Sequence, residues 1–206
     1  MIEYTNLLSF GDMIQLNYNC NTSKLLQEIK EFEWKQYNPR KDINRYGLSV
    51  TSLDGQLNGI DLDSLYQYNE IHNTKYNELS FKTFTDVYYK SKETQKLVEP
   101  FKPWICRTHY LNFRKGGYFP PHRDWRRIDK QSSFRVLVPI RDCYPNKLYF
   151  IYDGKILNFN QGTPYFVNTN KEHTIFSFSD NAIMLVMNIE CNKKSLNKIT
   201  ELMKNK

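Results

Sequence analysis

The chain has 206 residues, 40% of them hydrophobic and 25% charged, a balance that excludes intrinsic disorder and allows a folded core. Four cysteines without a CxxC pair argue against a zinc knuckle and a disulfide framework, so we expect reduced thiols. The net charge of +7 would permit contact with nucleic acid, but the lysines are scattered, which favours a solvated surface over a nucleic-acid interface.

The first half of the sequence predicts a helical extension with one strand. A helix is expected over residues 23–36, where Ser23 can cap the first turn and apolar residues recur at helical spacing. A strand is expected over residues 45–51. Two further short helices are expected, over residues 62–70 and 90–98. We therefore predict that residues 1–103 pack as an extension on a core formed later in the chain.

From residue 104 onward the sequence pattern changes to short apolar runs separated by turn residues. Short runs rich in aromatic and β-branched residues alternate there with turn pairs such as Asp153-Gly154. Such runs, at a spacing of roughly 8–12 residues, predict a mainly β fold over residues 104–192, as a jelly roll, sandwich or barrel. Residues 193–206 are expected to form a C-terminal helix against the sheet.

The sequence shows no secretory or membrane signal. Residues 1–5 carry no basic stretch followed by an apolar one. The longest apolar runs, near residues 134–140 and 182–189, have strand length rather than the ~20 residues that a membrane-spanning helix requires. We expect a cytoplasmic protein without membrane contact; its oligomeric state is not predicted.

His122-Arg123-Asp124, at the end of a predicted strand, is the candidate metal motif. Residues i and i+2 of an extended chain project to the same side, so one imidazole and one carboxylate can share an ion. A third ligand is expected from His173, which begins a strand 51 positions later, where a jelly roll would return the chain beside its start. This ligand set is typical of non-haem Fe(II) that binds a cosubstrate and O₂ together. The alternative is a surface pair of His122 and Asp124 with His173 as a capping residue.

Three segments then carry a family resemblance: Gly117–Asp124, Phe134–Ile140 and Phe166–His173. With them the chain resembles the aspartyl/asparaginyl β-hydroxylase-like oxygenases, which include free-proline hydroxylases and depend on Fe(II) and 2-oxoglutarate. The resemblance covers roughly residues 104–190 and implies a double-stranded β-helix, the cupin-like jelly roll. It implies that His122, Asp124 and His173 are the catalytic iron ligands. It also implies 2-oxoglutarate and O₂ as cosubstrates, and an amino acid, or an Asp, Asn or Pro side chain of a peptide or protein, as substrate.

Two departures from the family pattern concern 2-oxoglutarate. Leu137 replaces a polar residue, and residues 181–184 contain no arginine where the family places one to hold the far carboxylate. Arg135, the lone charge in an apolar strand, is expected to take that role, because a buried cation needs an anionic partner. The alternative for Arg135 is a structural ion pair with Asp142 or Glu172.

Further contacts are expected around the same cavity. Arg107 is a second candidate for 2-oxoglutarate or for an acidic group of the substrate, and Tyr110 could add a hydroxyl or simply pack. His109, in the same run, is expected to be an ordinary hydrogen-bonded sheet histidine. The expected substrate contacts at the rim are Trp125, Arg126, Arg127, Arg45 and Tyr46.

Three functions therefore remain open on the sequence. The first is the Fe(II)- and 2-oxoglutarate-dependent hydroxylase. The second is a cupin-like metal-binding protein or isomerase that does not use 2-oxoglutarate, since one fold supports many functions. The third is a metal-free binding domain that uses its positive surface.

Overall fold

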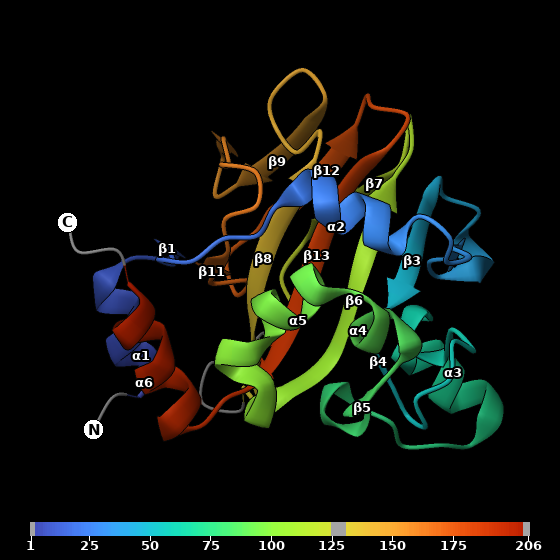
Figure 1. Ribbon diagram of the computed structural model, residues 1–206, viewed down its shortest axis with the longest axis horizontal. Helices are drawn as coiled ribbons and strands as arrows, with labels where there is room; N and C mark the ends of the chain where they lie inside the picture. Colours follow the sequence, from blue (N-terminus) through green and yellow to red (C-terminus); the bar gives the residue numbers. More distant parts are fainter. Residues whose placement is uncertain (1–2, 125–130, 204–206) are drawn as a thin grey trace.

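The computed structural model describes residues 3–124 and 131–203 and consists of two antiparallel sheets with helices on one side (Figure 1). The larger sheet contains, in spatial order, β1 (Met13–Gln15), β11 (Tyr165–Val167), β8 (Ser133–Arg141), β13 (Ala182–Glu190), β6 (Ile105–Phe113), β3 (Arg45–Ser49) and β2 (Lys35–Gln36). The smaller sheet contains β10 (Lys155–Leu157), β9 (Leu148–Tyr152), β12 (His173–Ser177) and β7 (Tyr118–His122). A separate pair is formed by β4 (Thr51–Ser52) and β5 (Thr83–Phe84).

The strand order is that of a double-stranded β-helix. From β6 to β13 the chain alternates between the sheets apart from the β9–β10 hairpin, with β6, β8, β11 and β13 in the larger sheet and β7, β9, β10 and β12 in the smaller one. All pairings between these strands are antiparallel. The predicted mainly β, jelly-roll fold is thereby confirmed, and β1, β2 and β3 from the N-terminal half extend its larger sheet.

Alternation along the long strands divides the apolar residues into two cores. On β8, Val136 and Val138 belong to the core under the helices, whereas Leu137 belongs to the core between the sheets. On β13, Leu185 belongs to the first core and Val186 to the second, because successive side chains of a strand point to opposite faces. Since both faces are covered, these strands appear in the sequence as nearly continuous apolar runs.

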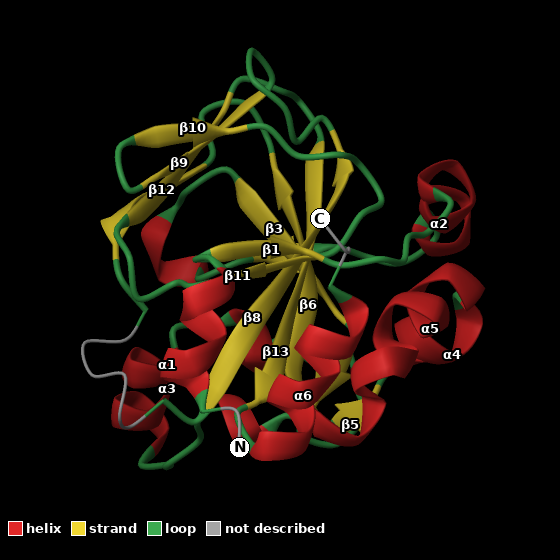
Figure 2. Cartoon of the chain, turned by 90° about the vertical axis from the view of Figure 1, so that its left-hand side faces the viewer, coloured by secondary structure: helices red, strands yellow, loops and turns green. Residues whose placement is uncertain are grey.

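Helices α1, α2, α4, α5 and α6 cover the face of the larger sheet that points away from the smaller sheet, as Figure 2 shows for α1, α4, α5 and α6. The α-helices are α1 (Tyr4–Leu7), α2 (Thr22–Ile29), α3 (Leu65–His72), α4 (Asp86–Lys90), α5 (Lys92–Val98) and α6 (Lys193–Leu202). Short 3₁₀ helices span Leu8–Phe10, Pro39–Lys41, Ile60–Leu62, Glu78–Ser80 and Glu99–Trp104. Within the described part of the chain, no helix is both long and apolar enough to cross a membrane.

The helix expected over residues 23–36 is shorter in the structure. Asn21, not Ser23, caps α2 by accepting a hydrogen bond from the Lys24 N–H, and α2 ends at Ile29. The chain then turns so that β2 can pair with β3, which brings Trp34 against the ring of Tyr110. Strand pairing and the burial of one large ring therefore override the helical spacing of the later apolar residues.

Candidate metal centre and cavity

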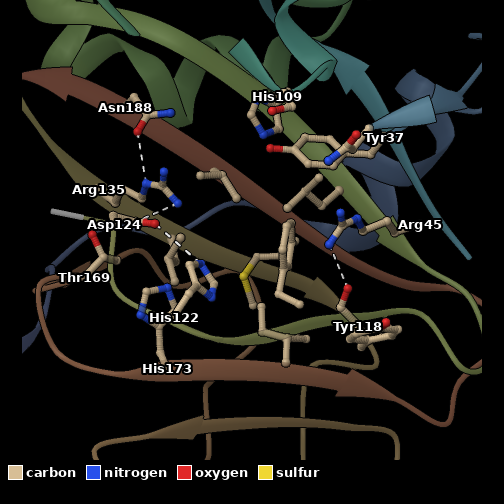
Figure 3. A pocket seen from close by; sticks show the side chains of 18 of the residues that line it. Tyr37, Arg45, His109, Tyr118, His122, Asp124, Arg135, Thr169, His173 and Asn188 are labelled. Carbon is tan, nitrogen blue, oxygen red and sulfur yellow. Dashed lines mark hydrogen bonds and ion pairs between the residues drawn. The ribbon is translucent and has the colours of Figure 1, made fainter. Parts of the chain in front are cut away.

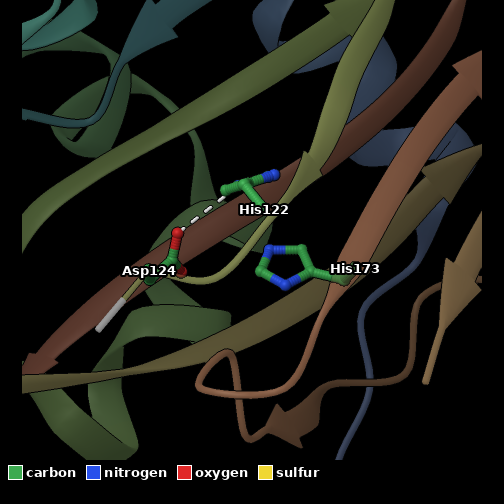
Figure 4. A group of neighbouring side chains, drawn as sticks. All are labelled: His122, Asp124 and His173. Carbon is green, nitrogen blue, oxygen red and sulfur yellow. Dashed lines mark ion pairs between the residues drawn. The ribbon is translucent and has the colours of Figure 1, made fainter. Parts of the chain in front are cut away.

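Two of the three candidate ligands are direct cross-strand partners. His122 at the end of β7 lies opposite His173 at the start of β12, and their ring centroids are 4.2 Å apart. Asp124 follows β7, and its backbone N–H donates to the carbonyl of Thr169 in the loop before β12 at 2.9 Å. One ligand atom from each of His122, Asp124 and His173 lies within 4.8 Å of the others (Figure 4).

Backbone carbonyls orient both imidazole rings through Nδ1 and leave Nε2 of each ring available to bind a metal ion. Nδ1 of His122 lies 2.7 Å from the Pro120 carbonyl oxygen, and Nδ1 of His173 lies 2.9 Å from that of Lys171. A carbonyl only accepts, so each Nδ1 carries the proton and each Nε2 offers its lone pair, an arrangement common in metal-binding histidines. Burial lowers the pKa of His173, which keeps this ring in the neutral, metal-binding form. The donor set therefore fits a divalent ion.

Arg135 holds the third candidate ligand, Asp124, in place. Its Nη1 lies 3.0 Å from Asp124 Oδ2 as an ion pair, and its Nε donates to Asn188 Oδ1 at 3.2 Å. Burial by itself raises the pKa of the Asp124 carboxyl, but the Arg135 guanidinium and the two imidazoles outweigh it and hold that pKa below its ordinary value. The carboxylate stays ionised, with Oδ1 turned to His122 Nε2 at 3.5 Å.

A cavity of about 660 Å³ opens between the two sheets beside these ligands (Figure 3). Its walls come from both sheets and from the N-terminal extension. Arg135 lines it, as expected, but the acid paired with Arg135 is Asp124 rather than Asp142 or Glu172. The Asp142 carboxylate instead accepts a hydrogen bond from Ser179.

Arg107 also lines the cavity, yet each of its three nitrogens has a protein partner. Nη1 lies 3.1 Å from Glu78 Oε1, and Nε and Nη2 donate to the carbonyls of Asp61 and Asp63 at 2.6 and 2.9 Å. Burial works against the charged form, but Glu78 overcomes it and the pKa of Arg107 is raised. The geometry is that of a structural ion pair that joins β6 to the extension.

Two of the expected contacts point away from the cavity. Tyr110 faces the helices, where it is fully buried and its hydroxyl lies 2.8 Å from that of Thr94. Tyr46 lies on the outer face of β3, where the guanidinium of Arg114 covers its ring. Both differences follow from alternation, because Tyr110 and Tyr46 are one position out of phase with the cavity-lining residues of their strands. The expected rim residues Trp125, Arg126 and Arg127 lie outside the described residues.

Arg45, in contrast, lines the cavity together with residues that the sequence did not single out as ligand contacts. Tyr37 precedes β3, His109 lies on β6, and Asn188 lies on β13. The spacing of two between His109 and Arg107 places both on one face of an extended chain, a signal that the sequence does contain. Asn188 is hidden in an apolar run, and only the register that sets it opposite Arg135 explains its position.

No protein-family model and no curated protein sequence matches the chain, whereas solved structures match it at low sequence identity. A prolyl-4-hydroxylase from Pseudomonas putida is 12% identical, with a TM-score of 0.47 over 90% of this chain and 95% of that one. An oxidoreductase of the 2OG-Fe(II) oxygenase family from Burkholderia pseudomallei is 11% identical, with a TM-score of 0.43 over 86% and 95%. KdgF from Halomonas sp. is 7% identical, with a TM-score of 0.40 over 80% and 92%. At this distance the fold assignment rests on the strand order of the chain itself, which is that of a double-stranded β-helix.

Proposed function

We propose that the protein is a non-haem Fe(II)- and 2-oxoglutarate-dependent dioxygenase that hydroxylates an amino acid or an Asp-, Asn- or Pro-type side chain of a peptide or protein. The observation that carries the proposal is the convergence of His122, Asp124 and His173 at the wall of a large cavity. Two histidines and one carboxylate with open positions are the ligand set that suits Fe(II) with a cosubstrate and O₂.

The roles of the residues follow from their contacts. His122, Asp124 and His173 would hold the iron, which together with 2-oxoglutarate and O₂ supplies the oxidising chemistry for an unactivated C–H bond. Arg135 fixes Asp124 through Nη1 and has no partner for Nη2 among the described residues. It can therefore donate from Nη2 to the distal carboxylate of 2-oxoglutarate while it keeps the metal carboxylate in place.

The rest of the cavity wall near the ligands is apolar. Leu137, Phe150, Met184 and Val186 come from three different strands and all line it. Such a wall excludes water from the reacting carbon and presents no nucleophile that would compete with the substrate.

A direct test is the release of succinate from 2-oxoglutarate. The purified protein is loaded with Fe(II) without oxygen, then exposed to O₂ with 2-oxoglutarate. Succinate is expected to form slowly even without a substrate, and the variants His122→Ala and His173→Ala should not form it. Metal binding without any succinate would contradict the proposal.

A second candidate is a cupin-like metal-binding protein or isomerase that does not use 2-oxoglutarate. The observation that favours it is on β13, the strand that follows β12. This strand presents Met184 and Val186 to the cavity but no cation that could hold the far carboxylate of 2-oxoglutarate. Anaerobic titration of the Mn(II)-loaded protein with 2-oxoglutarate separates the two, because only the oxygenase should bind it at the metal.

A further inference from the structure

Arg45 is a buried cation on the opposite side of the cavity from the metal ligands. Its side chain extends from β3, in the N-terminal extension, and only 3% of the residue is exposed (Figure 3). A charged group loses much hydration energy at such a position, so a buried guanidinium normally has an anionic partner.

Arg45 has no such partner among the described residues. Nη1 donates to the carbonyl of Tyr118 at 2.8 Å, and Nε has no hydrogen-bond acceptor. The guanidinium carbon lies 4.0 Å from the centroid of the Phe119 ring and 5.3 Å from that of Tyr37. Aromatic faces offset part of the lost hydration of a cation but do not neutralise it.

The carboxylates of the cavity wall do not neutralise the positive charge of Arg45. Within the described residues, each carboxylate of the cavity wall already pairs with an arginine. The pairs are Asp63 with Arg40, Glu78 with Arg107 and Asp124 with Arg135. Arg45 is thus the cation of the wall without a carboxylate, and Lys41, an exposed residue that also lines the cavity, makes no ion pair with a described residue either.

His109 adds a second unpartnered polar group to the same wall. It is 3% exposed, its Nδ1 has no hydrogen-bond partner, and its ring centroid lies 5.4 Å from that of Tyr37. Burial, with Arg107 and Arg135 nearby, lowers the pKa of His109 well below its ordinary value, so the ring is neutral. A buried neutral imidazole without a partner is costly unless a ligand completes its hydrogen bonds.

We propose that Arg45 binds a carboxylate of the organic substrate, with His109 completing the subsite, so that the substrate is an anionic amino acid or an acidic peptide. The identification of this ligand as the substrate rests on the proposed function. Phe119 links the two ends of the cavity, because its ring contacts Arg45 and lies 5.8 Å, centroid to centroid, from that of His122. A ligand anchored at Arg45 would lie along this ring with its other end toward the metal ligands.

The test follows the Nε–Hε resonance of Arg45 by NMR in the metal-free protein, with glutarate as the probe and neutral glutaramide as its control. The Nε–Hε group belongs to the guanidinium that lines the cavity, so glutarate bound at that guanidinium is expected to shift this resonance, and glutaramide is not. Arg45→Lys assigns the resonance and should weaken glutarate binding at least about tenfold, because an ammonium cannot replace the guanidinium fork. The backbone amide spectrum of the Arg45→Lys variant shows whether the variant is folded.

Arg114→Lys is the matched control. Arg114 also lies over a tyrosine ring, at 4.2 Å, but it is exposed and does not line the cavity. Glutarate affinity should not change in this variant. An unmoved Arg45 resonance, or equal losses in the two variants, would overturn the proposal.

A second arm adds Zn(II), a diamagnetic ion that takes the same histidine and carboxylate ligands, and then 2-oxoglutarate, before glutarate. The Arg45 resonance should still respond to glutarate, because 2-oxoglutarate is assigned to the metal and Arg135. If 2-oxoglutarate alone moves the Arg45 resonance and blocks glutarate, Arg45 belongs to the cosubstrate and the substrate assignment is wrong. The metal-free arm involves neither iron nor turnover, so its failure is distinguishable from the failure of succinate release.

Discussion

The Arg135 guanidinium and the Asp124 carboxylate form an ion pair of 3.0 Å at the edge of the cavity, linking β8 to the segment after β7. Only 10% of the Asp124 side chain and 25% of the Arg135 side chain are exposed. Arg135 therefore keeps the carboxylate of the candidate metal site ionised, and it also lines the cavity in which a ligand would bind.

We predict that Arg135→Met destabilises the metal-free protein by about 3–5 kcal/mol, because it leaves the buried Asp124 carboxylate without a cation. With saturating Mn(II) the loss should be smaller, since the divalent ion then balances the same carboxylate. Urea unfolding with and without Mn(II) measures both values. Equal losses in the two conditions would show that the pair has no connection to the metal site.

Tyr110 provides a contrasting prediction. Tyr110→Phe removes only the hydroxyl that contacts Thr94 under the helices. A buried hydrogen bond of this kind contributes about 0.5–1.5 kcal/mol, so unfolding should become easier by that amount. The affinity of the Mn(II)-loaded protein for 2-oxoglutarate should stay unchanged, and a weaker affinity would return Tyr110 to the ligand site.

Asp61 predicts a pH dependence of stability. The residue is fully buried, and burial raises the pKa of its carboxyl from 3.8 to about 6, although Ser49 donates a hydrogen bond to Oδ1. Between these two pH values the folded state binds the proton more tightly than the unfolded chain does. The unfolding free energy therefore decreases as the pH rises from about 4 to about 6.

Asp61→Asn should remove that decrease. The variant is expected to match the original chain near pH 4 and to be more stable by about 2–3 kcal/mol at pH 7, where Asp61 is ionised and its Oδ2 has no hydrogen-bond donor among the described residues. Other titrating groups are common to both proteins and cancel in the difference. Unfolding curves at four pH values measure it, and a difference that does not vary with pH would contradict the prediction.

The fold was largely predictable from the sequence because local patterns determine it. Turn pairs and short apolar runs indicated the strands, and the H-x-D motif with a histidine at the start of a later strand indicated the three side chains that converge at the cavity. What could not be predicted depends on register. Whether Arg135 meets Asp124 or Asp142, and whether Tyr110 or His109 faces the cavity, is decided by the pairing of strands distant in sequence.

The N-terminal half was the least predictable part for a related reason. Its segments are short, and tertiary pairing determines their structure, as in the early end of α2 and the pairing of β2 with β3. The position of Arg45 in a predicted strand was enough to expect it at the rim of the cavity. That it has no carboxylate partner can be seen only when all the residues of the cavity wall are known.

The most direct test of the account is an anaerobic calorimetric titration of Fe(II), or of Mn(II) as a stable substitute, into the metal-free protein. One ion per chain should bind. Metal affinity should fall by more than about 100-fold in each of His122→Ala, Asp124→Ala and His173→Ala, because loss of a group that only hydrogen-bonds to a metal ligand costs at most about 100-fold. His72→Ala, an exposed histidine at the end of α3, is the control and should bind normally. Unchanged binding in the His122 and His173 variants would contradict the metal centre on which the proposed function depends.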